Sequence, residues 1–407
     1  MNTSINLDPV VIVSCARTPI GAFQGELASL SAAQLGATAI AATLSRSTLD
    51  AAQINEVLMG CVLPAGQGQA PARQAALGAG LPFTASCTTI NKMCGSGMRA
   101  IMVAHDMLLA GSAEIIIAGG MESMSNAPYL LSKARGGYRL GHGMLYDHMM
   151  RDGLEDSFET KKPTAEPGRS MGTFGEDCAA KYQFTRAQQD EYATRSVTRA
   201  QQATASGALQ WEMAPIQVPN KKGDILIDSD EGPRRSKLDA IPQLKPAFRA
   251  DGTITAASSS SISDGAAALL LMRMSTAKRL GQKPLARIVQ HSTQSQAPAW
   301  FTTAPIGAIQ KILTYTGWKI SDVDLWEVNE AFAVVPMAAM HDLAIPLDKL
   351  NVHGGACALG HPIGASGARI VTTLLGALRR QGKQRGIASL CIGGGEATAL
   401  AIELISE

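Results

Sequence analysis

The sequence lacks the features that mark several broad classes of protein. Only 4% of its 407 residues are aromatic, and its apolar runs are shorter than the roughly 20 residues that cross a bilayer. A formal net charge of +2 gives no overall basic field for nucleic acid. The N-terminus, MNTSINLDPVV, has neither the basic and apolar regions of a secretory signal nor the Arg-rich pattern of a transit peptide. We therefore expect a cytoplasmic globular protein with no membrane span and no nucleic-acid partner.

The cysteines lack the spacing of a disulfide framework or a metal site. Their number is odd, and no CxxC pair occurs among them. We expect free thiols in a reducing compartment and no bound metal. They stand at Cys15, Cys61, Cys87, Cys94, Cys178, Cys357 and Cys391.

Short β-branched runs alternate with helical patterns in two separate regions of the chain. This alternation predicts an α/β protein with βαβ units around a buried, largely parallel sheet. In the first region the expected strands are 10–15, 56–62 and 113–120, with helices at 31–45 and after residue 70. In the second the expected strands are 266–272, 285–289, 324–328 and 387–392, with helices at 306–315, from 331 and from 364.

Residues 121–250, between these regions, have a different composition. They are richer in charge, glycine and proline, and they include a polar helix near 185–204 that Thr185 and Gln188 would cap. The segment therefore reads as an insertion. The predicted division is an N-terminal domain of 1–120 plus 251–280, a loop domain of 121–250 and a C-terminal domain of 281–407.

The two α/β regions also repeat one pattern. CGSGMRAI from Cys94 opens a predicted helix and precedes a strand that ends at Gly120. GASGARI from Gly364 opens another and precedes a strand that ends at Gly395. A duplicated domain is the simplest account, and it would place the two helix N-termini face to face.

Cys94 is the first candidate for chemistry. It lies just before a helix, where unpaired N–H groups and the helix dipole would stabilise a thiolate and lower its pKa. The same amides could hold an oxyanion. A single intracellular cysteine is more often a small apolar core residue, but glycines on both sides of the helix mouth favour a reactive thiol.

Three further polar residues lie at strand ends or in glycine-rich loops. His361 follows a loop of small residues and could act as the base for a thiol; alone it could be a satisfied loop histidine. Cys391 ends an apolar strand before three glycines, where a core cysteine beside a tight turn is the ordinary interpretation. Asn329 also ends a strand and could orient a water or simply form a turn or helix cap.

Together these segments resemble the thiolase family, and the resemblance runs from Val10 to the C-terminus. The matching motifs are PVVIVSCARTP from Pro9, GGMESMS from Gly119, NEAFA from Asn329, GHPIGASGAR from Gly360 and CIGGG from Cys391. The resemblance implies duplicated αβαβα layered domains with an inserted loop domain over the coenzyme A site.

The resemblance also implies a role for each candidate. Cys94 would accept the acyl group, His361 would activate it, and Cys391 would move the proton at Cα of a second acyl-CoA. Asn329 would hold a water that stabilises the thioester enolate, and the N–H groups of Cys94 and Gly393 would form a second oxyanion hole. A Claisen condensation needs these three functions: a nucleophile, a separate acid and base, and stabilisation of two oxyanions.

For coenzyme A, the resemblance points to the insertion and the loop after it. Ser260 would contact the pantetheine arm, Arg234 the adenine and phosphates, and Phe332 the tunnel. Met171 and Phe301 would lie by the acyl group. The serine run around Ser260 could be a flexible low-complexity loop, but its place directly before a strand favours an ordered one.

Several positions depart from the family pattern and bear on specificity. Ser170 replaces a usual histidine, Phe301 a frequent methionine, and His353 a usual asparagine, while Glu396 and Ala397 replace a Met-Gly or Gln-Gly pair. The stretch 161–169 reads as an extra loop. Because Phe301 is bulkier than methionine, we expect the acyl pocket to close beyond a few carbons.

The expected reaction is condensation of two acetyl-CoA to acetoacetyl-CoA and CoA, with the reverse thiolysis, without a tightly bound cofactor. We expect a homotetramer built from dimers joined near 85–90. The alternatives are a degradative 3-ketoacyl-CoA thiolase, a decarboxylating ketosynthase, a papain-like Cys/His hydrolase and a non-catalytic acyl-CoA or lipid-binding relative. A ketosynthase would carry histidine or asparagine in place of Cys391.

Overall fold

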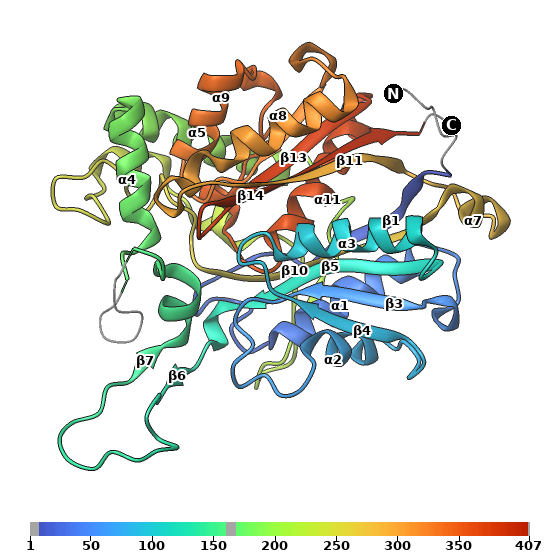
Figure 1. Cartoon of the computed structure of the whole chain (residues 1–407), viewed down its shortest axis with the longest axis horizontal. Coiled ribbons are helices and arrows are strands. Elements are labelled where there is room, and N and C mark those ends of the chain that lie inside the picture. Colours follow the sequence, from blue (N-terminus) through green and yellow to red (C-terminus); the bar gives the residue numbers. More distant parts are fainter. Residues whose placement is uncertain (1–7, 160–167, 406–407) are drawn as a thin grey trace.

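The computed structural model describes residues 8–159 and 168–405, and one mixed sheet runs through it (Figure 1). β1 pairs with β11 through Val11 and Ile12, and this contact joins the strands of the two halves. In order across the sheet the strands are β12 (Leu325–Val328), β13 (Arg385–Ile392), β14 (Glu396–Leu404), β11 (Ala286–Ser295), β1 (Val10–Arg17), β10 (Ser263–Arg273), β5 (Ile115–Ser123), β3 (Glu56–Gly60) and β4 (Ser86–Ile90), with β2 (Gly21–Ala22) beside β10.

The two halves of this sheet repeat one arrangement. β3 runs parallel to β5, which is antiparallel to β10, which is antiparallel to β1. β12, β13, β14 and β11 follow the same sequence of directions. The duplicated α/β fold is therefore confirmed.

The expectation of a largely parallel sheet was wrong. β13 and β14 are consecutive strands joined by a tight turn, and such a turn makes them antiparallel. Gly394 and Gly395 in that turn have φ of 93° and 88°, a region that glycine adopts without strain. β14 was not among the predicted strands, although the triple glycine that forms the turn before it is evident in the sequence.

Helices cover both halves and fill the space between them (Figure 1). α1 and α2 pack on the first half from outside, and α8 and α9 cover the second half. α3 and α11 form the middle layer, where they contact each other and strands of both halves. These helices are α1 (Ala32–Ser45), α2 (Pro71–Gly78), α3 (Ser96–Ala110), α8 (Ala304–Thr316), α9 (Val334–Leu343) and α11 (Ser366–Gln381).

α3 and α11 approach most closely where each begins. A Cβ on Gly97 would lie 2.9 Å from backbone atoms of Gly364 and Ala368, and one on Gly367 would lie 2.3 Å from the Met98 nitrogen. Only glycine permits this backbone contact. The prediction that the two helix starts meet is thus confirmed.

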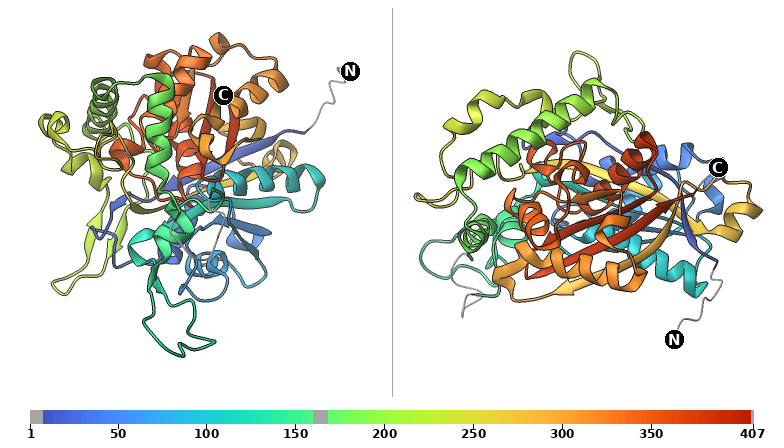
Figure 2. Two further views of the ribbon diagram at one scale, coloured as in Figure 1. Left: turned by 60° about the vertical axis from the view of Figure 1, so that its left-hand side comes forward. Right: turned by 90° about the horizontal axis from the view of Figure 1, so that it is seen from above.

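The chain between β5 and β10 gathers on one side of the two halves (Figure 2). Thr185 and Gln188 form the predicted capping box at the start of its longest helix. The three-part division of the chain stays a prediction. This segment contains α4 (Met171–Tyr182), α5 (Arg186–Ala205), α6 (Glu231–Arg235) and the short strands β6 (Tyr129–Leu130), β7 (Tyr146–Asp147), β8 (Ile216–Val218) and β9 (Ile225–Ile227); the remaining helices are α7 (Met274–Arg279) and α10 (Ala356–Leu359).

A buried arginine ties this segment to the sheet. Arg17, the last residue of β1, binds Glu212 at 2.5 Å and Asp230 at 2.7 and 2.9 Å. All three side chains are buried. Removing one partner from such a group costs about 3–5 kcal/mol, because a buried charge remains.

Among residues 8–159 and 168–405, no helix is both long and apolar enough to cross a bilayer.

Candidate active site

The loop before α3 presents Cys94 at the start of the helix. Met93 has a positive φ of 47°, uncommon for a residue with a side chain. Asn91 Oδ1 accepts a hydrogen bond from Met93 N at 3.0 Å, and Gly95 N donates to Lys92 O at 3.0 Å. This tight turn directs the chain into α3 with Cys94 at its mouth.

The Cys94 thiol is surrounded by opposing influences. Burial raises its pKa to about 11, while the N–H groups of Gly393 and of Cys94 itself lower it. The carboxylate of Glu122 raises it further. The expectation that the helix start gives Cys94 a lowered pKa was therefore wrong, because loss of water outweighs the two amides. The same two amides are those expected to form an oxyanion hole.

Cys391 lies close to Cys94, at the penultimate position of β13. It is buried, and burial, followed by the charge of Cys94, raises its pKa well above the usual value. The thiol is therefore neutral in the free protein. Once it is deprotonated, a thiol with so high a pKa is a strong base, and removal of a proton from carbon requires a strong base.

His361 contacts Ser366 through its Nδ1. His361 Nδ1 lies 2.6 Å from Ser366 Oγ, and Ser366 Oγ also donates to Pro362 O at 3.0 Å, so an Nδ1–H that donates to Ser366 satisfies both contacts. In that tautomer Nε2 carries the lone pair. Burial, aided by the charge of Arg369, lowers the pKa of His361 to about 3. The imidazole is thus a neutral base with Nε2 free to accept a proton.

Asn329 lies beside this base, just after β12. Its Nδ2 is 3.5 Å from His361 Nε2, and its Oδ1 accepts from Arg369 Nη2 at 3.3 Å. Arg369 is buried and contacts Glu327 at 3.4 Å. The guanidinium accordingly fixes the amide so that its NH₂ group faces His361.

Glu122, the penultimate residue of β5, connects the two halves at the start of α11. Its carboxylate accepts from Gly364 N at 2.8 Å, Val62 N at 2.9 Å and Leu63 N at 3.2 Å. Burial raises the pKa of Glu122 to about 7, although these three amides lower it. The bonds hold the segment between His361 and α11 against the end of β5 and the segment that follows β3.

A cavity of about 230 Å³ is lined by His361, but by neither cysteine, nor by Asn329 or Glu122. Ser260, Phe332 and Met171 also line it. Cys94 packs on an apolar cluster that shares lining residues with the cavity. Those shared residues are Met124, Leu154, Ile262 and Ile363. Two hollows of about 890 Å³ lie elsewhere, between α1 and β8 and on residues 132–146, away from the cysteines.

The serine run is an ordered loop. Ser260 N and Oγ both donate to Ala331 O, at 2.9 and 3.0 Å, and Ala333 N donates to Ser258 O at 2.8 Å. Phe332 also meets Phe248 edge to face, with ring centroids 5.7 Å apart. The loop thus forms one wall of the cavity by pairing with the NEAFA segment.

A surface groove of about 400 Å³ shares Ser261 with this cavity, and it contains Arg235 and Lys237. Arg234, the expected phosphate contact, does not line it and pairs with Glu26 at 2.5 Å. The structure thus places two neighbouring basic residues, rather than Arg234, along this groove.

The departures from the family pattern have different environments. Ser170 lines the cavity, but Phe301 lies in the outer core, edge to face with Phe174 at 6.0 Å. His353 is buried with Nδ1 unpaired within the described chain. Glu396 binds Lys92 at 2.6 Å, which ties β14 to the Cys94 loop. Residues 161–167 of the expected extra loop lie outside the described residues.

Three supporting residues were not predicted as part of the site. Ser366 and Arg369 lie within the GHPIGASGAR motif and Glu122 lies within GGMESMS. A buried polar residue inside a glycine-rich motif is the available signal, since such a residue needs partners.

Family models for the thiolase N-terminal and C-terminal domains match residues 10–275 and 282–404. The chain belongs to the thiolase family. It is 47% identical over 405 residues to acetyl-CoA acetyltransferase 2 of Arabidopsis thaliana, covering 99% of this chain and 98% of the relative. It is 47% identical over 398 residues to acetyl-CoA acetyltransferase of Escherichia coli strain K12, covering 97% and 99%.

A solved thiolase relative has the same fold. The crystal structure of the Bacillus anthracis acetyl-CoA acetyltransferase matches with a TM-score of 0.93 and 39% identity, covering 98% of this chain and 99% of that chain. The thiolase fold leaves no place for the papain-like interpretation. The chain is therefore an acyltransferase of the thiolase family, and Cys94, His361 and Cys391 are its candidate catalytic residues.

Proposed function

We propose that this thiolase is an acetyl-CoA C-acetyltransferase, which condenses two acetyl-CoA to acetoacetyl-CoA and CoA and catalyses the reverse thiolysis. The observation that carries the proposal is the meeting of two helix starts, one with Cys94 facing the Gly393 amide and one with a neutral His361. Relatives named acetyl-CoA acetyltransferase, at 47% identity over almost the whole chain, support the acetyl group as substrate.

In the first half-reaction Cys94 attacks the thioester carbon of acetyl-CoA. Its proton passes to His361 Nε2, and the departing CoA sulfur takes that proton back. The N–H groups of Cys94 and Gly393 hold the transient oxyanion. The products are free CoA and an acetyl group on Cys94. Because the Cys94 pKa is raised to about 11, we expect the thiol to lose its proton only as it attacks.

In the second half-reaction His361 Nε2 first takes the proton of the Cys391 thiol, and the Cys391 thiolate then takes a proton from Cα of a second acetyl-CoA. The protonated His361 and a water on Asn329 stabilise the resulting enolate, which attacks the acetyl carbonyl. The Cys94 sulfur leaves and receives the proton from His361 Nε2. The cycle gives acetoacetyl-CoA and restores both cysteines. It needs no tightly bound cofactor.

The groove with Arg235 and Lys237 is the proposed place for the phosphates of coenzyme A, with the pantetheine arm passing Ser260 and Phe332. A cavity of about 230 Å³ suits a short acyl group. Phe301, outside that cavity, would limit chain length only indirectly, while Ser170 borders it directly.

The test is a series of steady-state rates with 3-ketoacyl-CoA substrates of four to ten carbons. We expect the highest kcat/KM for acetoacetyl-CoA and a graded fall, since each methylene changes binding by about 1–3 kcal/mol. A steady rise with length would favour the degradative 3-ketoacyl-CoA thiolase of fatty-acid oxidation, because Ser170 leaves room in the cavity. Absence of turnover with every substrate would favour the binding relative.

We further propose a homotetramer in the cytoplasm. β4 is an edge strand available to a second protomer, and the projecting segment between β6 and β7 (Figure 1) exposes Leu140, Met144 and Leu145. All seven cysteines are unpaired, which suits a reducing compartment. Light scattering should give four chains per particle; a stable active monomer would refute the assembly.

A further inference from the structure

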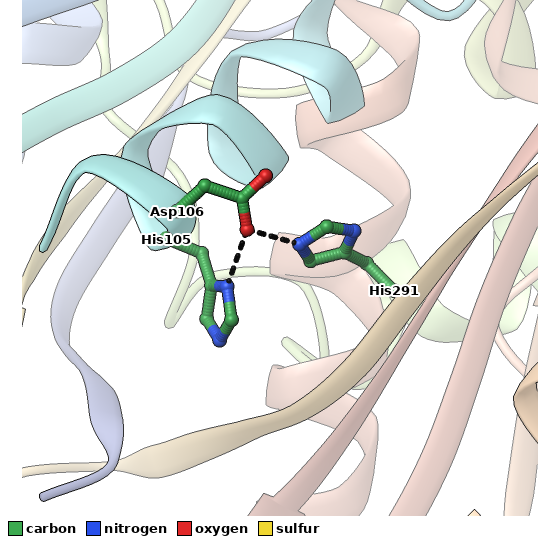
Figure 3. Close-up of side chains that lie close together, drawn as sticks. All are labelled: His105, Asp106 and His291. Atoms are coloured by element: carbon green, nitrogen blue, oxygen red, sulfur yellow. Dashed lines mark hydrogen bonds and ion pairs between the residues drawn. The ribbon is translucent and has the colours of Figure 1, made fainter. Parts of the chain in front are cut away.

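A cluster of two histidines and one aspartate lies at the far end of α3, away from the thiol chemistry. His105 and Asp106 belong to α3, and His291 comes from β11 in the other half of the molecule (Figure 3). Asp106 Oδ1 lies 3.1 Å from His105 Nδ1 and 2.8 Å from His291 Nε2. The two imidazole rings meet edge to face, with centroids 4.9 Å apart. One oxygen of the Asp106 carboxylate thus lies within hydrogen-bonding distance of both imidazoles.

The cluster has the dimensions of a metal site. One ligand atom from each residue lies within 4.8 Å of the other two. Zinc bonds of 2.0–2.2 Å place tetrahedral ligand atoms about 3.3 Å apart. The observed separations from Asp106 Oδ1 are close to this spacing. Small side-chain rotations would therefore open room for an ion at the centre.

The polar partners of the cluster also suit a cation. The side-chain contacts of His105, Asp106 and His291 in the described residues are with one another, and no arginine or lysine is among them. His105 is buried and His291 largely so, while the Asp106 side chain is 55% exposed and leaves a path from solvent.

We propose that His105, Asp106 and His291 form a binding site for a divalent transition metal of the zinc type, which clamps α3 of the first half to β11 of the second. Two imidazoles and one carboxylate favour zinc or cobalt over magnesium or calcium, which prefer oxygen ligands. His105 lies about 16 Å along the helix from Cys94, at 1.5 Å per residue. The metal stabilises the packing of the two halves and does not touch the acyl group.

Cobalt(II) titration of the full-length protein tests the site, because cobalt reports its ligands by colour. We expect one ion per chain with weak visible bands and no intense thiolate charge-transfer band. Asp106→Asn and His291→Gln should each lower the affinity by at least about tenfold, the usual scale for loss of a supporting ligand contact. Binding that persists unchanged in both variants, or that shows thiolate bands only, overturns the proposal.

A matched control is available on α9. His341 pairs with Asp342 at 2.8 Å, but this pair has no second histidine beside it, so His341→Gln should leave cobalt binding unchanged. The second readout is thermal. Zinc at about one hundred times Kd should raise the Tm of the wild type by roughly 3 °C for a chain of this length. The same Tm rise in Asp106→Asn would contradict the clamp.

Discussion

The starts of α3 and α11 are the same structural element put to two uses. Cys94 in CGSG and Gly364 in GASG hold corresponding positions. At α11, Gly364 N donates to the Glu122 carboxylate at 2.8 Å, so the protein's own anion fills the helix start. At α3, the N–H groups of Cys94 and Gly393 face the Cys94 sulfur. One helix start is occupied by a carboxylate of the protein, and the other is the one that we propose for the reaction.

The serine and the arginine that follow in each of the two motifs also differ in their contacts. Ser366 bonds the catalytic candidate His361, whereas Ser96 bonds only backbone, accepting from Lys92 N at 2.8 Å and donating to Met93 O at 2.6 Å. Arg369 is buried beside Asn329, while Arg99 on α3 is partly exposed. Corresponding residues at the two helix starts thus make different contacts in this structure.

Loss of the Cys94 thiol should break this comparison most completely. Cys94→Ala makes the α3 start as unreactive as the α11 start, and kcat should fall on the order of 10⁶-fold, as for other catalytic nucleophiles. The measurement is the initial rate of acetoacetyl-CoA thiolysis. Cys15→Ala, which removes a buried thiol from β1, is the matched control and should retain activity. Substantial turnover by Cys94→Ala would exclude it as the acyl acceptor.

The two serines should separate function from stability. Ser366→Ala leaves the Nδ1–H of His361 without an acceptor, which costs about 1–3 kcal/mol, so kcat should fall about tenfold or more. Ser96→Ala removes only a turn contact and should lower Tm while kcat stays within about twofold. Parallel measurement of kcat and Tm checks this. An equal kcat loss in both variants would contradict the division of labour.

Neutralising Glu122 should have the smallest effect. Its charge raises the pKa of Cys94, so Glu122→Gln should lower that pKa and speed alkylation of Cys94 a few-fold. Because burial raises the pKa of Glu122 to about 7, the wild-type carboxyl is neutral below that pH, and the difference should appear only above about pH 7. Iodoacetamide rates across pH 6–9 provide the measurement. An equal difference at pH 6 would show a structural cause instead.

The same carboxyl gives a pH dependence of stability. Its folded pKa lies above the ordinary 4.5, so its contribution to stability is fully present below pH 4.5 and is lost as pH rises through about 7. The free energy of unfolding of the wild type, measured by denaturant across this window, should fall relative to that of Glu122→Gln. A constant difference between the two proteins would contradict the raised pKa.

Local sequence patterns were sufficient for much of the fold. The β-branched runs located β1 and β13, and Thr185 with Gln188 marked the start of α5, since these signals depend on neighbouring residues. Strand direction was not predictable in the same way, because it depends on which strands meet across the whole sheet. Duplication of CGSG and GASG predicted the close helix pair, for which Gly97 and Gly367 are the physical reason.

The candidate site, too, was only partly predictable from the sequence. Motif resemblance selected Cys94, His361 and Asn329, and the structure places the latter two 3.5 Å apart. It could not predict the raised pKa of Cys94, because burial by distant segments opposes the local helix effect. It also could not predict that Arg235 lines the surface groove while Arg234 does not, since each arginine pairs with a carboxylate, Arg234 with Glu26 and Arg235 with Glu231.

In the proposed reaction Cys94 carries the acetyl group while Cys391 moves only the proton. The most direct test is incubation of Cys391→Ala with acetyl-CoA, followed by intact mass measurement and peptide mapping. We expect one acetyl group per chain, on the peptide that contains Cys94, with acetoacetyl-CoA formation reduced by about 10²–10⁴-fold. An acetyl group on another residue, or normal acetoacetyl-CoA formation by this variant, would contradict it.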